Sequence, residues 1–388
     1  MKRFNVVIIG AGPAGSFLAY KLGRLGISVL FLEKEKFPRY KICAGGLSKK
    51  SYDILFSEDH EIKKIIKNNI RKGIYVRNNK LTFTDAGKNL IYMIYRSELD
   101  DFLVKMAVGN KSVDFEDNIA IKNIDKKKNI ITYYKQNKEC IVNYNILVGA
   151  WGTNKKLNNL VNLIPFERYA ISSSWEGPAG PKYGKFSNEY AVCQINKGNP
   201  GIVGYIFPKK DKITAGLFTS IGKAIDLKKM WNEFINFWHL DKKIKPRYAL
   251  IPIRDYSKPI TRENILLVGD AAGLADPFTG EGIYYALKSS IIASNKIKKF
   301  LENKNYKLDL EYEKTINLNF SNIQKWAKLY EFLFKHFTNL SFWFGSEFFI
   351  GNEILNSFIA GDKKYNELSE IMKYSVKRIF KKSIRKCN

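Results

Sequence analysis

The feature that most constrains this chain is a glycine-rich turn near its N-terminus, Gly10-Ala11-Gly12-Pro13-Ala14-Gly15. Residues 5–9 before the turn form a β-branched run typical of a buried parallel strand, and residues 16–25 after it have helical spacing. A second strand is predicted over residues 27–32, ending at Glu33. These segments together predict a β-α-β unit.

The spacing of the three glycines is that of a dinucleotide-binding turn. Gly10 permits the tight turn, Gly12 lets a pyrophosphate approach the backbone, and Gly15 allows close packing of helix and strand. The helix N-terminus offers N–H groups and a positive dipole end to phosphates, and the Glu33 carboxylate can accept hydrogen bonds from ribose hydroxyls. We predict cofactor-binding positions at Gly10, Gly12, Ala14, Gly15, Glu33 and Lys34.

A second turn of small residues lies far along the chain, at Gly269-Asp270-Ala271-Ala272-Gly273. Residues 264–268 before it predict a strand, and a helix is predicted from about residue 280 to 300. A carboxylate at a strand end suits the ribityl chain and second phosphate of a flavin dinucleotide, and small residues let the main chain approach a flat ring. Both turns together indicate FAD. The cofactor positions predicted here are Gly269, Asp270, Gly280, Gly282 and Ile283.

With 388 residues, the chain has room for two or three domains. Short strand-like runs alternate with Gly, Pro and Asn turns over residues 74–95 and 169–218, which favours antiparallel sheet, and the pattern beyond residue 300 is helical. The predicted fold class is α/β: a Rossmann-like FAD-binding domain interrupted by an antiparallel-sheet substrate domain, with a helical C-terminal region. The expected boundaries are 1–73, 96–160 and 250–300 for the first domain, 74–95 and 161–249 for the second, and 301–388 for the helical region.

Charge and composition exclude some classes but select no partner. A hydrophobic share of 45% excludes an intrinsically disordered chain. The formal net charge of +28 suits nucleic acid, an anionic membrane or a phosphorylated substrate, but a compositional bias towards Lys, Asn and Ile also accounts for it. No stretch approaches the roughly 18 uninterrupted apolar residues of a membrane-spanning helix. The four cysteines lack zinc or dithiol spacing, so we expect no metal and a reducing, cytoplasmic setting.

The two turns and the segment Arg96-Ser97-Glu98-Leu99-Asp100-Asp101-Phe102-Leu103 resemble the FAD-dependent hydroxylase superfamily typified by para-hydroxybenzoate hydroxylase. The resemblance implies that Arg96 lies near FAD and that Asp270 contacts the ribityl or phosphate region. Many relatives carry Gly-Ala-Asp-Gly where this chain has Gly149-Ala150-Trp151-Gly152. In those relatives the aspartate is linked to flavin and nicotinamide handling, and this chain has Trp151 in its place. Two electron donors therefore stay open: NAD(P)H and a reduced ferredoxin-like protein.

A narrower resemblance is to the geranylgeranyl reductases. The segment Phe37-Pro38-Arg39-Tyr40-Lys41-Ile42-Cys43-Ala44-Gly45-Gly46-Leu47 is similar to one in which a lysine and a cysteine precede paired glycines. Two further matches are Gly204-Tyr205-Ile206-Phe207-Pro208 and the stretch 358–365. Relatives have Tyr-x-Trp-x-Phe-Pro where Val203 and Tyr205 stand here. The resemblance implies an FAD-dependent reductase that saturates C=C bonds of an isoprenoid chain on a lipid, quinone or diphosphate carrier, with Cys43, Ala44 and Gly45 beside the flavin.

Saturating an isolated C=C bond needs hydride at one carbon, a proton at the other, and a dry site lined by aromatic groups. Tyr205 and Phe207 are candidates to stabilise cation-like charge on the substrate. Cys43 is the candidate proton donor or relay, since an unperturbed thiol is protonated at neutral pH. The alternative is that Cys43 is a small buried hydrophobic residue, as free cysteines often are.

Several alternatives stay open at this point. The stripe Met372, Val376, Phe380 and Ile384, surrounded by Lys and Arg, is typical of a basic helix on an anionic membrane surface, or of a helix docked on the protein. A flavin-dependent monooxygenase of the same fold is the alternative enzyme. A non-catalytic basic protein that binds membrane or nucleic acid is the alternative class. Two separated flavin motifs argue against it, so we expect no nucleic-acid partner.

Overall fold

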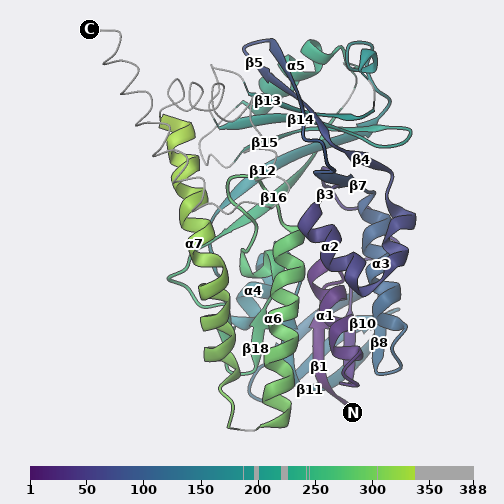
Figure 1. Cartoon of the computed structure of the whole chain (residues 1–388). Coiled ribbons are helices and arrows are strands. Elements are labelled where there is room, and N and C mark those ends of the chain that lie inside the picture. Colours follow the sequence, from purple (N-terminus) through teal and green to yellow (C-terminus); the bar gives the residue numbers. More distant parts are fainter. Residues whose placement is uncertain are drawn as a thin grey trace.

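An eight-stranded sheet carries the N-terminal glycine turn at the end of a central strand (Figure 1). The structure, a computed structural model, describes residues 1–336 apart from 187, 196–200, 220–225, 242, 244 and 304. In the sheet, β1 (Lys2–Ile9) lies between β2 (Val29–Leu32) and β11 (Lys138–Gly149) and runs parallel to both. Two more parallel strands flank these, β8 (Val113–Glu116) beside β2 and β18 (Ile265–Leu267) beside β11. The carboxyl ends of these strands therefore meet at one edge, where ligands of open α/β sheets bind.

Helices from distant parts of the chain pack side by side against this sheet. α1 (Pro13–Gly23) contacts both α3 (Arg96–Val108) and α6 (Ile283–Glu302), and α7 (Leu308–His336) lies along α6 (Figure 1). The strands β1 and β2 consist mostly of branched apolar residues because the large hydrophobic cluster between sheet and helices buries them. The smaller elements of this part are β17 (Thr261–Arg262), β9 (Ile119–Asp125), β10 (Ile130–Lys135) and α4 (Lys155–Val161).

A second, seven-stranded sheet lies beyond the carboxyl edge of the first (Figure 1). Its order is β16 (Arg247–Arg254), β12 (Phe166–Gly177), β15 (Ile213–Thr219), β14 (Ile202–Pro208), β13 (Tyr190–Ile195), β5 (Lys72–Arg77) and β6 (Lys80–Asp85). The helix α5 (Leu227–Trp238) packs on it and forms a hydrophobic cluster of its own with the sheet. A short 3-10 turn, η2 (Tyr183–Lys185), contributes Tyr183 to that cluster.

Short elements lie where the two sheets approach each other. A three-stranded sheet joins β3 (Gly46–Ser48), β7 (Ile91–Met93) and β4 (Asn68–Ile70). The helices α2 (Lys49–Glu58) and η1 (His60–Ile65) follow β3. The 3-10 turn η3 (Gly269–Ala272) follows β18. The loop that contains Cys43 leads directly into β3, so it lies between the two large sheets.

The structure confirms the predicted α/β fold class and adds details that the sequence did not indicate. The second sheet is not purely antiparallel, because β5 and β13 pair in parallel. Parallel neighbours need a long connection, and more than 100 residues separate these two strands. The helix expected over 16–25 begins at Pro13, whose fixed backbone angle suits the first helical position, and ends at Gly23. α7 agrees with the helical pattern predicted after residue 300.

Some predicted features fall outside the described residues. These are the stretch 358–365 and the basic stripe at 372–384. Over the part of the chain that the structure does describe, none of the helices combines the length and apolar character needed to cross a bilayer.

Candidate functional site

The first glycine turn closes the gap between β1 and α1. Gly10 has φ +110°, and a Cβ atom there would overlap the Ala150 carbonyl oxygen and lie 2.8 Å from the Trp151 nitrogen. A Cβ atom at Gly15 would overlap the Gly10 carbonyl oxygen. A Cβ atom at Gly12, in contrast, would meet nothing closer than an Arg39 nitrogen at 3.9 Å. Two of the glycines are therefore needed for packing, and the third leaves space in front of the backbone.

Glu33 lies at the end of β2 and is buried. Its carboxylate accepts hydrogen bonds from the Ala11 N–H at 2.7 Å and the Glu35 N–H at 3.1 Å. These bonds tie the end of the second strand to the glycine turn. Ala11 lies between the turn glycines, so Glu33 also fixes the backbone of the predicted binding turn. The Lys34 side chain is 69% exposed and pairs with Glu35 at 3.4 Å, away from the other predicted residues.

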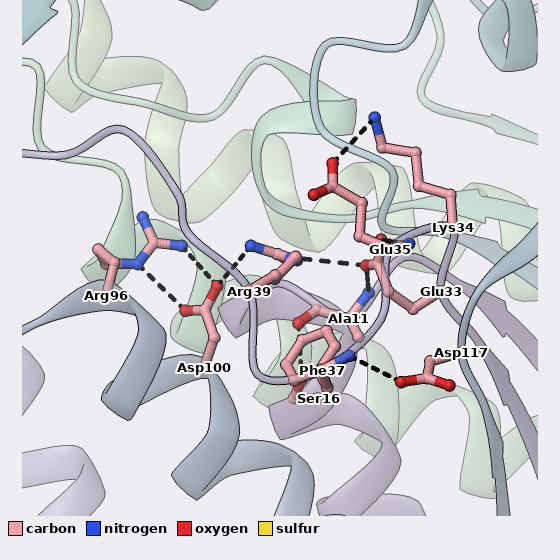
Figure 2. Close-up of polar contacts among 10 residues, drawn as sticks. All are labelled: Ala11, Ser16, Glu33, Lys34, Glu35, Phe37, Arg39, Arg96, Asp100 and Asp117. Atoms are coloured by element: carbon pink, nitrogen blue, oxygen red, sulfur yellow. Dashed lines mark hydrogen bonds and ion pairs between the residues drawn. The ribbon is translucent and has the colours of Figure 1, made fainter. Parts of the chain in front are cut away.

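Arg39 is a residue of this site that the sequence analysis did not single out. Its guanidinium lies between Glu33, at 3.8 Å, and Asp100, at 3.1 Å, and its side chain is only 10% exposed. Figure 2 shows the series of contacts that runs from Arg96 through Asp100 and Arg39 to Glu33. One Arg39 nitrogen, Nη1, has this ion pair but no hydrogen-bond partner within the described residues. The other terminal nitrogen, Nη2, lies 3.9 Å from a Cβ position at Gly12 and 3.8 Å from Glu33, so the guanidinium offers a positive group next to the turn that suits an anionic ligand.

Arg96 starts α3 and forms a bidentate pair with Asp100, one turn further on. The distances are 3.1 Å from Nε to Oδ1 and 3.0 Å from Nη2 to Oδ2, and the Asp100 side chain is fully buried. Burial opposes the charge on Arg96, but Asp100 and the nearby Cys43 outweigh it and raise the pKa of the guanidinium. Arg96 is therefore a fixed positive charge next to Cys43.

The second glycine turn packs directly on the first. A Cβ atom at Gly269, which has φ +56°, would lie 2.8 Å from the Ala14 Cβ atom and 3.5 Å from the Ala286 Cβ atom. The Ser290 hydroxyl on α6 donates to the Ala14 carbonyl at 2.7 Å. The structure thus brings together two turns that lie more than 250 residues apart in sequence, with η3 between the N-terminal ends of α1 and α6.

Asp270 sits where these helices meet. Its Oδ1 atom would be 3.3 Å from a Cβ atom at Gly282, the residue that precedes α6 at Ile283. Burial raises the pKa of Asp270, while the positive charges of Lys41 and Arg96 lower it in part. Gly280, with φ +71°, turns the chain just before, close to the Phe218 ring. Asp270 therefore lies with Gly280, Gly282 and Ile283 at the start of α6.

The Cys43 loop connects this part of the site with the second sheet. The Gly45 N–H lies 3.4 Å from the Cys43 sulfur, and the Ser174 hydroxyl on β12 donates to the Cys43 carbonyl at 3.4 Å. Gly45 has φ +78°, and a Cβ atom there would lie 2.5 Å from the Ile94 carbonyl oxygen. One at Gly46 would lie 3.1 Å from the Phe207 ring. Ala44, partly buried between Cys43 and Gly45, belongs to the same loop.

Tyr205 and Phe207 lie on the same side of β14, because side chains alternate along a strand. Ile206, between them, belongs to the cluster under α5, so the two aromatic rings face the other way, towards the Cys43 loop. Their ring centroids are 5.4 Å apart. The Tyr205 hydroxyl donates to the Ser173 carbonyl at 2.8 Å, and burial raises the pKa of Tyr205 to about 12. Tyr205 is therefore a neutral aromatic wall.

Known proteins resemble this chain in sequence. Residues 3–158 match a family described as an FAD binding domain. An uncharacterised protein of Methanosarcina barkeri is 35% identical over 306 residues, which cover 76% of this chain and 75% of that protein. A digeranylgeranylglycerophospholipid reductase of Picrophilus torridus is 25% identical over 408 residues, covering 96% of this chain and 95% of that one.

Solved structures agree on the fold. A geranylgeranyl bacteriochlorophyll reductase-like protein of Thermoplasma acidophilum has a TM-score of 0.77 at 22% identity, covering 87% of this chain and 88% of that one. The chain belongs to the geranylgeranyl reductase family of FAD-dependent oxidoreductases. A flavin-dependent brominase has the same fold, with a TM-score of 0.72 at 18% identity over 97% of this chain and 100% of that one. The fold is therefore wider than the reductase family.

The residues of this geranylgeranyl reductase family member fit an FAD molecule. The residues before α1 and α6, Gly12 and Gly282, are glycines that supply no side-chain cap, and neither helix has an acidic residue in its first turn. Their first N–H groups are therefore available to phosphate oxygens. In α1 the free N–H groups follow Pro13, which has none. The atom nearest to the open position at Gly12 is Arg39 Nη2, 3.9 Å away, so a positive charge borders this space. In the described part of the chain, no three His, Cys, Asp or Glu side chains form a group that could hold a metal ion.

Trp151 has a packing role at the end of β11. Its ring folds back over Gly149, where a Cβ atom would lie 2.6 Å from a ring carbon and from Leu267. The indole N–H donates to the Asn158 side chain at 2.9 Å. Trp151 is thus a packing residue between β11 and α4, and it brings no charge to the site.

Proposed function

We propose that this FAD-dependent oxidoreductase saturates C=C bonds of an isoprenoid chain carried on a lipid, a quinone or a diphosphate. The observation that carries the proposal is the position of the Cys43 loop. It lies between the two glycine turns on one side and the Tyr205–Phe207 pair on the other. A thiol between a flavin-type site and an aromatic wall is the arrangement that protonation of an apolar double bond requires. The name of the Picrophilus relative supports the same substrate class.

Each proposed site residue has a defined task. Bound FAD, once reduced, supplies the hydride. The Gly10–Gly15 turn, Arg39 and the start of α6 hold the phosphates, and Asp270 orients the ribityl chain. The rings of Tyr205 and Phe207 exclude water and face positive charge that develops on the substrate carbon. Cys43 delivers the proton of its thiol to that carbon, and Arg96 lies beside the sulfur.

The electron donor and the location of the enzyme are parts of the same proposal. Trp151 supplies no carboxylate for nicotinamide handling, which favours a reduced ferredoxin-like protein over NAD(P)H as donor. An isoprenoid lipid resides in a bilayer, and the net charge of +28 is compatible with the anionic surface of a cytoplasmic membrane. We propose that the enzyme works at that surface as a peripheral protein.

The test is anaerobic turnover. The purified protein, with its flavin reduced by dithionite, is incubated with geranylgeranyl diphosphate or a digeranylgeranyl glycerophospholipid, and products are read by mass spectrometry. Reductase activity raises the product mass by about 2 Da for each bond, and the flavin spectrum returns to the oxidised form. A product heavier by about 16 Da that forms only with oxygen would assign the protein to the monooxygenases instead. A purified protein without flavin would support the non-catalytic class.

A further inference from the structure

Lys209 carries a buried positive charge that the proposed function does not use. It follows β14, and its side chain has no exposed surface. The ammonium group forms an ion pair with Glu176 on β12 and donates to the Thr214 hydroxyl on β15 at 2.6 Å. It also lies 4.4 Å from the centre of the Tyr95 ring. An ammonium has three N–H donors, and the described residues supply oxygen acceptors for two of them.

This ammonium group lies against the Cys43 loop. A Cβ atom at Gly45 would be 3.1 Å from Lys209 Nζ and 3.0 Å from its Cε atom. The N–H of the same glycine lies 3.4 Å from the Cys43 sulfur. The sulfur and the ammonium therefore approach one residue from two sides, and the two groups interact electrostatically. No larger residue fits at Gly45 without displacing Lys209.

The far side of Lys209 leads to water through Glu176. The Glu176 side chain is 24% exposed, whereas that of Lys209 is fully covered. The Thr214 hydroxyl lies between them, 3.3 Å from the same Glu176 oxygen. Tyr95 and Asp211, joined by a 2.7 Å hydrogen bond, also lie near the ammonium. A continuous set of polar groups thus runs from solvent to the Cys43 loop.

We propose that Lys209 and Glu176 form a proton relay that reprotonates Cys43 after each turnover, an inference that rests on the proposed function. The Cys43 S–H bond breaks as a C–H bond forms on the substrate, whose other carbon has received hydride from reduced flavin. An N–H bond of Lys209 then breaks as the S–H bond re-forms. The Glu176 carboxylate takes up a proton from solvent and passes it to the neutral amine, which restores the ion pair. The sum is the addition of one hydride and one solvent proton to the double bond.

The electrostatics of the cluster agree with this role. Burial lowers the pKa of Lys209, while Glu176, Cys43 and Asp211 raise it in part. A buried lysine of lowered pKa gives up a proton more readily than an exposed one. The residue acts through Cys43, so it is a positioning residue for the proton.

The first experiment compares two substitutions under the anaerobic turnover conditions given above. Lys209→Arg keeps the charge, but a guanidinium does not release its proton in this pH range. The relay predicts that Lys209→Arg and Lys209→Met both lose turnover by about 10-fold or more while retaining flavin. Methylamine should restore turnover to Lys209→Ala, and tetramethylammonium, which has no proton to give, should not. If Lys209→Arg turns over like the wild type, or both cations rescue Lys209→Ala equally, the relay is wrong.

The matched control is a second ion pair with nearly the same burial. Arg254 and Glu313 are 0% and 21% exposed, against 0% and 24% for Lys209 and Glu176, and they join β16 to α7. Glu176→Gln should slow turnover and change its pH profile, whereas Glu313→Gln should leave both as in the wild type. Equal effects of the two substitutions would show that Lys209 has only a structural role.

A further measurement needs no turnover and separates failure of the relay from failure of the proposed function. Iodoacetamide alkylation of Cys43 is followed by mass spectrometry of its peptide in flavin-loaded protein at pH 7. If the ammonium acts on the sulfur, alkylation in Lys209→Met is at least about threefold slower than in the wild type, and Lys209→Arg restores it. Equal rates in all three proteins would overturn the relay even if reductase activity is found. A protein that shows the alkylation effect but no reduction of prenyl chains would contradict the proposed function alone.

Discussion

At the scale of single residues, the site depends on glycines that serve different needs. Gly10 combines φ +110° with close contact to the Ala150 carbonyl, so both its backbone angle and its lack of a side chain are required. Gly26, at the end of the same β-α-β helix, has φ +70° but nothing within 4 Å of a Cβ position. Both glycines have a positive φ, but they differ in its value and in their steric surroundings.

This difference predicts the outcome of two alanine substitutions. Gly10→Ala should cost about 3 kcal/mol or more in unfolding free energy and abolish flavin binding, because the backbone at Ala150 and Trp151, just after β11, must move. Gly26→Ala should cost about 1 kcal/mol, the penalty of the left-handed conformation, and keep its flavin. Urea unfolding and the flavin absorbance of each purified variant are the measurements. Stoichiometric flavin in Gly10→Ala would contradict the packing argument.

Asp270 gives a prediction in which stability and binding change in opposite directions. Burial raises its pKa above the unfolded value of 3.8, so the stabilising effect of the protonated form is present below that value and is lost as pH rises through the folded pKa. In flavin-free protein, Asp270→Asn should raise Tm by about 1–2 °C at pH 7, and the gain should shrink towards pH 4. Flavin affinity should fall in the same variant.

Thermal scans of flavin-free wild type and Asp270→Asn from pH 4 to 8 measure the first effect, and fluorescence titration with FAD measures the second. A substitution that lowers both Tm and affinity would make Asp270 a structural residue of the η3 turn.

At the scale of elements, one carboxylate near the start of α3, that of Asp100, pairs with two arginines. Asp100 is fully buried and pairs with Arg96 and Arg39, whereas its neighbour Asp101 forms an exposed pair with Lys105 at 2.6 Å. Asp100→Asn should destabilise the protein by about 3–5 kcal/mol because it leaves two covered guanidinium groups without their counter-charge. Asp101→Asn should cost less than about 1 kcal/mol. Denaturant unfolding of the two variants decides this, and similar costs would contradict the assigned roles.

The same scale shows what a sequence can and cannot reveal. The turn at 10–15 was predictable because strand, turn, helix and Glu33 follow one another within 33 residues. Arg39 has no such local pattern. Its importance depends on Asp100, 61 residues further on, which approaches it only once α3 packs beside α1. Lys209 could not be assigned for the same reason, since its partners come from β12 and β15 through the register of the second sheet.

At the scale of the whole molecule, the site exists only where separate regions meet. The order β17-β18-β11-β1-β2-β8 places the ends of β1 and β18 at one edge, with β11 between them. The sequence indicated this meeting through two flavin motifs. It did not indicate the parallel pair of β5 and β13, which links the second sheet to the segment after the Cys43 loop. Parallel pairing leaves no turn signal, because its strands need not be neighbours in sequence.

This architecture predicts how FAD stabilises the protein. The two hydrophobic clusters are separate, but the Cys43 loop is tied to β12 through Ser174 and packs on Phe207 of β14. Binding at the glycine turns should therefore stabilise the second sheet as well as the first. At a free FAD concentration of 100 times Kd, linkage gives about 2.7 kcal/mol, or a Tm increase of about 3–4 °C for a chain of this size.

Hydrogen exchange with and without FAD should show protection of residues 202–208 together with residues 9–16. A second sheet that melts at the same temperature with and without FAD would show that the two parts unfold independently. The Cys43 loop would then not be the mechanical link between cofactor and substrate sides that its contacts indicate.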